Sequence, residues 1–211
     1  TFSIFAVARH GIRDLKLSAD RSALEPRSQQ IREKLSFVSG GLESIVLSSY
    51  DAFLLHGLFL IPPRIDRRHS SALRQISVKE MLTECDAQKL ARLIASGSKA
   101  PILISPEPLL ADIGNDIVRK NSNAPTQPVQ YEEVCATIED EFGQPGVHWL
   151  WQDPSTIGDQ FNTIREYSVG SVALKGLKNA KQHASIDVRH MNDDYGRIVL
   201  ENVVEKLRTL V

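Results

Sequence analysis

The feature that most constrains this chain is the alternation of short apolar runs with helical patterns. Three runs have the length and composition of strands that are buried on both faces: residues 2–8, 44–49 and 101–105. Apolar residues at helical spacing predict helices in the other segments, at 28–38, 51–60, 86–95 and 106–119. Strands that alternate with helices favour a mainly parallel sheet with helices on both faces.

The next segment predicts an antiparallel edge. Residues 129–139 and 147–151 flank Gly143-Gln144-Pro145-Gly146, a turn signal that is typical of a hairpin. Residues 76–82 have a weaker extended pattern, and the polar residues 121–128 predict a loop. The expected fold class is therefore α/β: a three-layer sandwich with a mainly parallel sheet, an antiparallel edge hairpin and a C-terminal helical extension.

The last part of the chain predicts helices only. We expect an α/β domain at 1–153 and a helical extension at 154–211, with helices at 157–182 and 194–210. The final helix carries four aliphatic residues on one stripe: Val199, Val203, Leu207 and Leu210. Such a stripe has to be buried. It either packs on the α/β domain or forms an interface with a second copy or another protein.

The composition limits the kinds of molecule that the chain is expected to bind. Lys plus Arg number 25 and Asp plus Glu 26, so no overall charge favours nucleic acid or a membrane surface. The longest apolar run, 52–63, is shorter than the ~20 residues that span a bilayer. The start of the chain has no signal-peptide pattern, so we expect a cytoplasmic protein.

Cys85 and Cys135 lie far apart without a CxxC motif, and we expect no metal and no cofactor. The basic segment 64–74 is either a solvated loop or an anion-binding loop.

One tripeptide carries chemistry because of its position. Arg9-His10-Gly11 directly follows the first strand, and open α/β sheets bind ligands at the carboxyl ends of their strands. A histidine ring nitrogen can accept a phosphoryl group, and an adjacent arginine can hold its oxygens. Glycine lets the backbone turn tightly.

With this turn, the chain resembles the histidine phosphatase superfamily (phosphoglycerate mutase-like), and within it the SixA-type phosphohistidine phosphatases. The resemblance covers residues 2–153 and rests on four segments in order: IFAVARHG, ESIVLSS, MLTECDAQKLARLIASGSKAPILIS and VCATIEDEFGQPGVHWLWQDP. It implies a phosphate pocket formed by Arg9, His10, Gly11, Arg13, Ser49 and Ser105. His10 would be the nucleophile beside Arg9, and Glu80 or Glu84 the proton donor.

Two positions depart from the family pattern. The family's arginine after the second strand is replaced in Ser49-Tyr50-Asp51-Ala52-Phe53, and its second histidine is replaced in Ser105-Pro106-Glu107-Pro108. Losing such groups removes stabilisation of the charge that develops in phosphoryl transfer. The resemblance therefore implies a weakly active or inactive regulatory module that binds a phosphorylated protein or a small phosphoester. The alternative is an active phosphatase that forms a phosphohistidine.

The remaining histidines have a simpler interpretation. His56, within the helix expected at 51–60, and His148, in the expected hairpin, are interpreted as structural. His183 and His190 show no ligand spacing for a metal.

Overall fold

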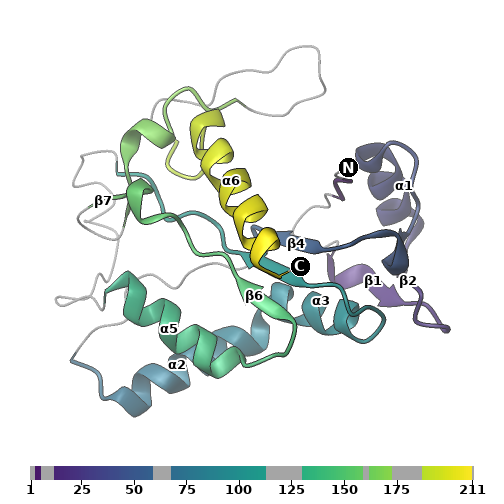
Figure 1. Cartoon of the computed structure of the whole chain (residues 1–211), viewed down its shortest axis with the longest axis horizontal. Helices are drawn as coiled ribbons and strands as arrows, with labels where there is room; N and C mark the ends of the chain where they lie inside the picture. The colour runs from purple at the N-terminus through teal and green to yellow at the C-terminus, as the bar shows by residue number, and fades with distance from the viewer. Residues whose placement is uncertain are drawn as a thin grey trace.

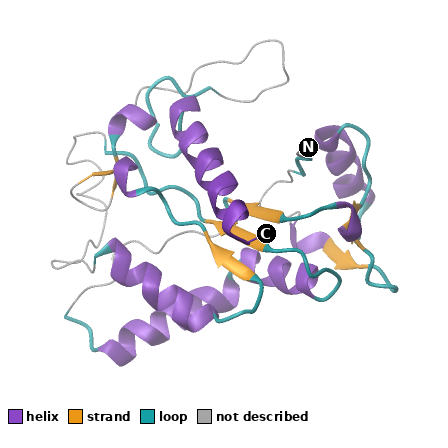
Figure 2. Cartoon of the chain, in the orientation of Figure 1, coloured by secondary structure: helices purple, strands orange, loops and turns teal. Residues whose placement is uncertain are grey.

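A computed structural model describes residues 3–5, 12–58, 68–112, 130–158, 162–172 and 187–210. Its helices are α1 (Gln29–Ser39), α2 (Ser71–Glu84), α3 (Asp86–Ala95), α5 (Tyr131–Phe142) and α6 (Asp193–Leu210) (Figure 1). Its strands are β1 (Leu15–Leu17), β2 (Ala23–Pro26), β3 (Ile45–Val46), β4 (Phe53–His56), β5 (Ile102–Ser105), β6 (Val147–Trp149), β7 (Ile157–Gly158) and β8 (Asn162–Thr163). Helices and strands are mixed throughout the described residues, which confirms the α/β class (Figure 2).

A parallel three-stranded sheet forms the centre, in the order β4-β5-β6. Phe53 is opposite Ile102 and His56 opposite Ser105 in the first pair, while Ile102 is opposite Val147 in the second. All four residues of β5 are buried, as expected for an interior strand covered on both faces. The strand predicted at 101–105 is thus confirmed.

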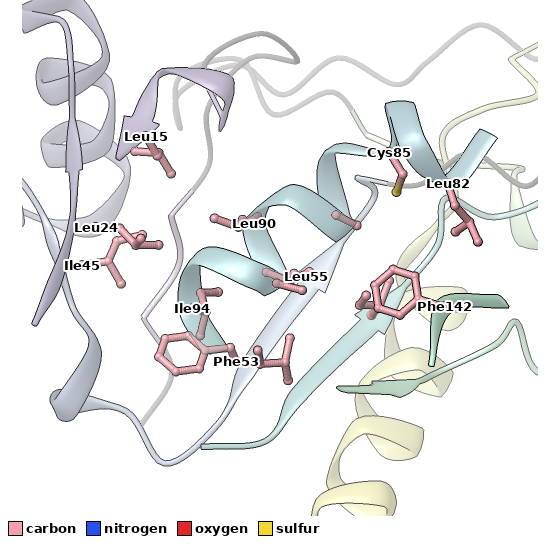
Figure 3. Packing of buried hydrophobic residues seen from close by; sticks show 14 of the residues in the cluster. Leu15, Leu24, Ile45, Phe53, Leu55, Leu82, Cys85, Leu90, Ile94 and Phe142 are labelled. Atoms are coloured by element: carbon pink, nitrogen blue, oxygen red, sulfur yellow. The ribbon is translucent and has the colours of Figure 1, made fainter. Parts of the chain in front are cut away.

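Helices cover both faces of this sheet, which gives three layers. On one face, Phe53 and Leu55 of β4 pack against Leu90 and Ile94 of α3 (Figure 3). The same cluster includes buried residues from α2 and α5: Val78, Leu82, Val134, Ile138 and Phe142. The other face, which carries the alternate residues of each strand, lies under α6 (Figure 1).

A second sheet lies beside the first and is antiparallel, in the order β1-β2-β3. Its residues Leu15, Leu24 and Ile45 join the same core as α3 and β4 (Figure 3). A third, two-stranded antiparallel pair is formed by β7 and β8. The antiparallel component is therefore present, but not where the sequence placed it.

Helix α1 shows how local signals determine a helix. The Ser28 side chain accepts a hydrogen bond from the Ile31 backbone N–H, and Ile31 and Leu35 are the buried residues of one face. Gly40 ends the helix with φ 76°, a left-handed conformation that glycine adopts without strain. The helices predicted at 28–38, 86–95 and 194–210 are all confirmed.

Two predictions in the first half were wrong. The helix expected at 51–60 is strand β4, in which Phe53 and Leu55 are buried while Leu54 and His56 are exposed. That alternation has the period of a half-buried strand. The extended segment expected at 76–82 belongs to α2, which begins after the Ser70 cap. The strand expected at 44–49 is only partly present, as β3 followed by a 3-10 helix at Leu47–Ser49.

The expected hairpin was also wrong. Residues 131–142 form helix α5, and Gly143 ends that helix with φ 39° instead of starting a strand turn. Strand β6 then pairs with β5 in the parallel direction. Residues 106–112 are not helical, and the described parts of 157–182 form β7, β8 and a 3-10 helix at Arg165–Tyr167. Most of 2–8 and all of 121–128 lie outside the described residues.

The C-terminal part packs on the α/β part through a buried network around Gln152. Its side-chain oxygen accepts a hydrogen bond from the Leu109 N–H, and its side-chain nitrogen donates to Thr156 and Thr163. Its backbone N–H donates to the Tyr131 hydroxyl. Residues on both sides of the expected boundary at 153 therefore share one polar cluster.

Helix α6 turns its aliphatic stripe toward its own chain. Val203 is 1% exposed, and Val199, Leu207 and Leu210 are half-buried. Asn202 also donates a hydrogen bond to the Asp153 carboxylate. The side of α6 that carries Val199, Asn202 and Val203 therefore contacts residues earlier in the chain.

Gly97 provides a test of how closely the end of α3 approaches the antiparallel sheet and its turns. A Cβ at this position would lie 2.2 Å from the Arg21 carbonyl oxygen and 2.6 Å from Leu47 Cδ1. We expect Gly97→Ala to lower the free energy of unfolding by about 1–3 kcal/mol, because the backbone has to shift. Gly196→Ala is the matched control, since no atom lies within 4 Å of its added Cβ. Equal urea midpoints for the two variants would contradict the close approach.

Candidate functional site

The first expected site residues cannot be placed. Arg9, His10 and Gly11 lie outside the described residues. The chain is described again on either side of them. Phe5 packs edge-to-face on Tyr50, with ring centroids 5.9 Å apart, at the amino end of β4. Arg13 lies in a 3-10 helix at Ile12–Asp14.

Arg13 is held at the start of α3. Its Nε donates to Asp86 Oδ1 at 2.8 Å, and the Asp86 side chain is only 15% exposed. The neighbouring Cys85 thiol contacts the Leu58 carbonyl oxygen, at 3.9 Å, just after β4. Arg13 and Asp86 therefore lie near the carboxyl end of β4, where open α/β sheets bind ligands. The positive charge of the Arg13 guanidinium is therefore already paired with the Asp86 carboxylate.

The two expected serines are not brought together. Ser49 ends the 3-10 helix that precedes β4, so it lies on the amino-terminal side of the parallel sheet. Ser105 is the last residue of β5, at the carboxyl-terminal edge. Because β4 and β5 run in the same direction, the two hydroxyls lie toward opposite ends of the sheet.

A histidine that the sequence analysis took as structural lies at this edge instead. His56 is the last residue of β4, directly opposite Ser105, and its Nδ1 lies 3.0 Å from Ser105 Oγ. The signal was in the sequence: His56-Gly57 ends a short apolar run, just as His10-Gly11 does. It was missed because residues 51–60 were interpreted as a helix.

A carboxylate lies close to the His56 ring. Gly57 has φ 71°, and a Cβ built there would be 3.8 Å from Glu107 Cγ, so the Glu107 side chain lies over this turn. Desolvation by surrounding protein atoms lowers the pKa of His56, and the Glu107 charge acts in the opposite direction. Desolvation is the larger effect, so the neutral ring is favoured at pH 7.

The two expected proton donors lie on α2. Glu80 is exposed about one turn before the end of that helix, and Glu84 is its last residue. The side chain of Glu84 is not among the described ones. Because α3 starts directly after α2, both residues lie along the chain toward the carboxyl-terminal edge.

The basic segment 64–74 is described only from residue 68. Within that part, Arg74 lies 3.5 Å from the Glu133 carboxylate of α5 and donates to the His69 carbonyl oxygen. This contact directs Arg74 toward α5.

A pocket lies beside β6. Phe142, Trp149, His148 and Lys206 line a cavity of about 400 Å³ at the end of α5. Trp149 stacks on Trp151 with parallel rings whose centroids are 4.6 Å apart. Desolvation and the Lys206 charge lower the pKa of His148, so this ring too is favoured in its neutral form.

Some classes of site are not found in the part of the chain that is described. Its residues contain no group of three or more His, Cys, Asp or Glu side chains that could hold a metal ion. No helix within those ranges is long and apolar enough to cross a membrane. Burial raises the pKa of the Cys135 thiol to about 12, which keeps it protonated and unreactive at pH 7.

Comparison of the chain with models of protein families, with curated proteins and with solved structures found no match.

Proposed function

We propose that this chain is a degenerate domain of the histidine phosphatase type that binds a phosphorylated protein or a small phosphoester with little turnover. The ligand would lie at the carboxyl-terminal edge of the parallel sheet, beside the Arg9-His10-Gly11 turn. In this proposal His10 and Arg9 contact the phosphate group. Arg13 adds positive charge.

The observation that carries the proposal is the anchoring of Arg13 at this edge. Phe5 is packed near the amino end of β4, while Arg13 is paired with Asp86 near the carboxyl end. Three peptide units separate Arg13 from His10, a reach of at most about 11 Å. The proposal therefore puts His10 close to the edge where α/β sheets bind ligands.

Weak turnover follows from the charges at the same edge. Asp86 already pairs with Arg13, and Glu107 adds a second carboxylate near the end of β5. Phosphoryl transfer depends on positive groups that stabilise the transferring phosphate. Losing one such group typically costs about 2.7–4 kcal/mol of barrier. Binding needs less stabilisation than this, so a binding role is favoured over an efficient phosphatase.

The test uses p-nitrophenyl phosphate, first as a substrate and then as a ligand. We expect turnover close to the uncatalysed rate, and we expect His10→Ala to leave it unchanged. Binding measured by titration calorimetry should weaken about tenfold in His10→Ala, because a hydrogen bond to a charged group is lost. His190→Ala, in which an exposed histidine is removed, is the matched control.

Two results would contradict the proposal in different ways. Rapid turnover that His10→Ala abolishes would establish the active phosphatase instead. Binding that is equal in wild type, His10→Ala and Arg9→Ala would remove the phosphate site altogether.

A further inference from the structure

We propose that the protein hydrolyses uncharged carboxylic esters and that His56, held in place by Ser105, is the general base for this reaction. This activity does not rest on the phosphate-binding proposal, because His56 and Leu54 take no part in that proposal, although Glu107 lies at the sheet edge that both use. Phe53 and Leu55 point toward α3, so the alternate residues Leu54 and His56 point to the opposite face. Arg13 and Asp86 lie at the start of α3.

The relative exposure of the two partners assigns their roles. Ser105 is 5% exposed, so its hydroxyl is too enclosed to attack a substrate. His56 is exposed as a residue, although neighbouring protein atoms partly desolvate its ring. Ser105 is therefore a positioning residue, and the histidine ring is the group that meets the substrate.

The hydrogen bond to Ser105 orients the ring. When Nδ1–H donates to Ser105 Oγ, across the 3.0 Å contact, the Nε2 lone pair is left available. Since Nδ1 is turned toward the buried serine, Nε2 is the ring nitrogen that does not face Ser105. A neutral imidazole with an open Nε2 is the form that a general base needs.

The surroundings of His56 select the charge of the substrate. Glu107, in the segment that follows β5, is the charged residue that affects His56 electrostatically among the described ones. Its carboxylate stabilises the imidazolium that forms when His56 takes a proton, and it repels anionic substrates. The surroundings of the His56 ring therefore suit a neutral ester better than a phosphoester or a carboxylate.

An apolar contact for the substrate lies next to the ring. Leu54 is two residues before His56 on the same face of β4 and is 37% exposed. Two residues apart on a strand, the side chains lie side by side. Leu54 can cover a short acyl chain while the ester carbonyl lies near Nε2.

The proposed step needs only water. Nε2 removes a proton from a water molecule as the water oxygen bonds to the ester carbonyl carbon, and the C=O π pair moves to the carbonyl oxygen. The tetrahedral intermediate then re-forms the C=O bond and expels the alcohol oxygen with its electron pair. The imidazolium returns its proton to that oxygen. The products are a carboxylic acid and an alcohol, and nothing is oxidised or reduced.

The experiment measures hydrolysis of p-nitrophenyl acetate and p-nitrophenyl butyrate by the full chain. We expect kcat/KM to fall at least about 100-fold in His56→Ala and in the more conservative His56→Gln. His190→Ala, which removes another exposed histidine, should leave the rate unchanged. This control separates a built site from the reaction of any surface imidazole with an activated ester.

Substitutions of the neighbouring residues should each change a different kinetic property. Ser105→Ala should lower kcat about tenfold with little change in KM, because one orienting hydrogen bond is lost. Leu54→Ser should lower the butyrate-to-acetate ratio of kcat/KM roughly 5-fold. The wild-type rate should rise with pH through an apparent pKa below the ordinary 6.5 and then level off. Glu107→Gln should move this rise to lower pH, because the Glu107 charge raises the pKa.

One measurement on the unmodified protein avoids any question of folding. Long-range ¹H–¹⁵N spectra of histidine rings report which nitrogen carries the proton, and the proposal requires Nδ1–H for His56. A dominant Nε2–H form, or ester hydrolysis that is equal in wild type and His56→Gln, would overturn it. Ester hydrolysis and the binding of p-nitrophenyl phosphate are separate readouts, so a failure of this proposal and a failure of the phosphate proposal are distinguishable.

Discussion

Replacing Ile104 by alanine is expected to lower the free energy of unfolding by about 2–5 kcal/mol. Ile104 is 0% exposed in the central strand of the parallel sheet, in the same cluster as residues of α2, α3 and α5. Removing three carbon atoms there loses their burial and leaves a cavity that the surrounding strands can only partly fill. Domains are typically stable by about 5–15 kcal/mol, so the loss is a large fraction of the total.

The measurement is urea unfolding followed by circular dichroism. Phe37→Ala is the control, because Phe37 is 84% exposed on α1 and its removal should change stability by about 0.5 kcal/mol or less. A loss in Ile104→Ala as small as in Phe37→Ala would show that β5 is not the centre of the core.

Replacing Gln152 by alanine is expected to lower the free energy of unfolding almost as much as Ile104→Ala, for a different reason. Its side chain satisfies the Leu109 N–H and the hydroxyls of Thr156 and Thr163 in a buried cluster. Each group left unpaired costs about 1–3 kcal/mol. Only the Leu109 N–H is left unpaired, because the Thr156 and Thr163 hydroxyls still donate to the Asp153 and Leu109 carbonyl oxygens. With the two lost threonine hydrogen bonds added, we expect stability to fall by about 2–5 kcal/mol.

Gln152→Leu separates this effect from the loss of volume. Leucine fills much of the space but pairs with none of the three groups, so we expect it to be nearly as destabilised as alanine. Gln75→Ala, at an exposed position of α2, is the control. Unfolding of Gln152→Ala should also remain a single transition, because the cluster joins residues on both sides of 153. A separate early transition of the C-terminal part would contradict that coupling.

Local sequence was sufficient where a segment carried its own end signals. Helix α1 has the Ser28 cap at its start and Gly40 at its end, and its prediction was correct to within one residue at each end. Strand β5 was predicted from a continuous apolar run with proline before it, and such a run suits a strand buried on both faces. In both cases the signal used for the prediction lies within a few residues along the chain.

Local sequence was insufficient where the same residues suit two structures. The apolar run at 51–60 fits a helix and a strand equally, and the pairing of β4 with β5 decided for the strand. Gly143 can start a hairpin turn or end a helix, and it ends α5. That choice left β6 free to pair with β5 in parallel.

The candidate site was likewise predictable from the sequence only in part. The sequence by itself indicated that polar residues would follow apolar strands at one edge of an α/β sheet, because strand ends and glycine turns are local features. Only the tertiary structure decided which residues meet there. His56 and Ser105 are 49 positions apart, and their contact depends on the register of β4 against β5. Ser49 was excluded from that edge because it precedes β4 instead of following a parallel strand. A register between distant strands is set by how their buried side chains pack together, and no local pattern contains that information.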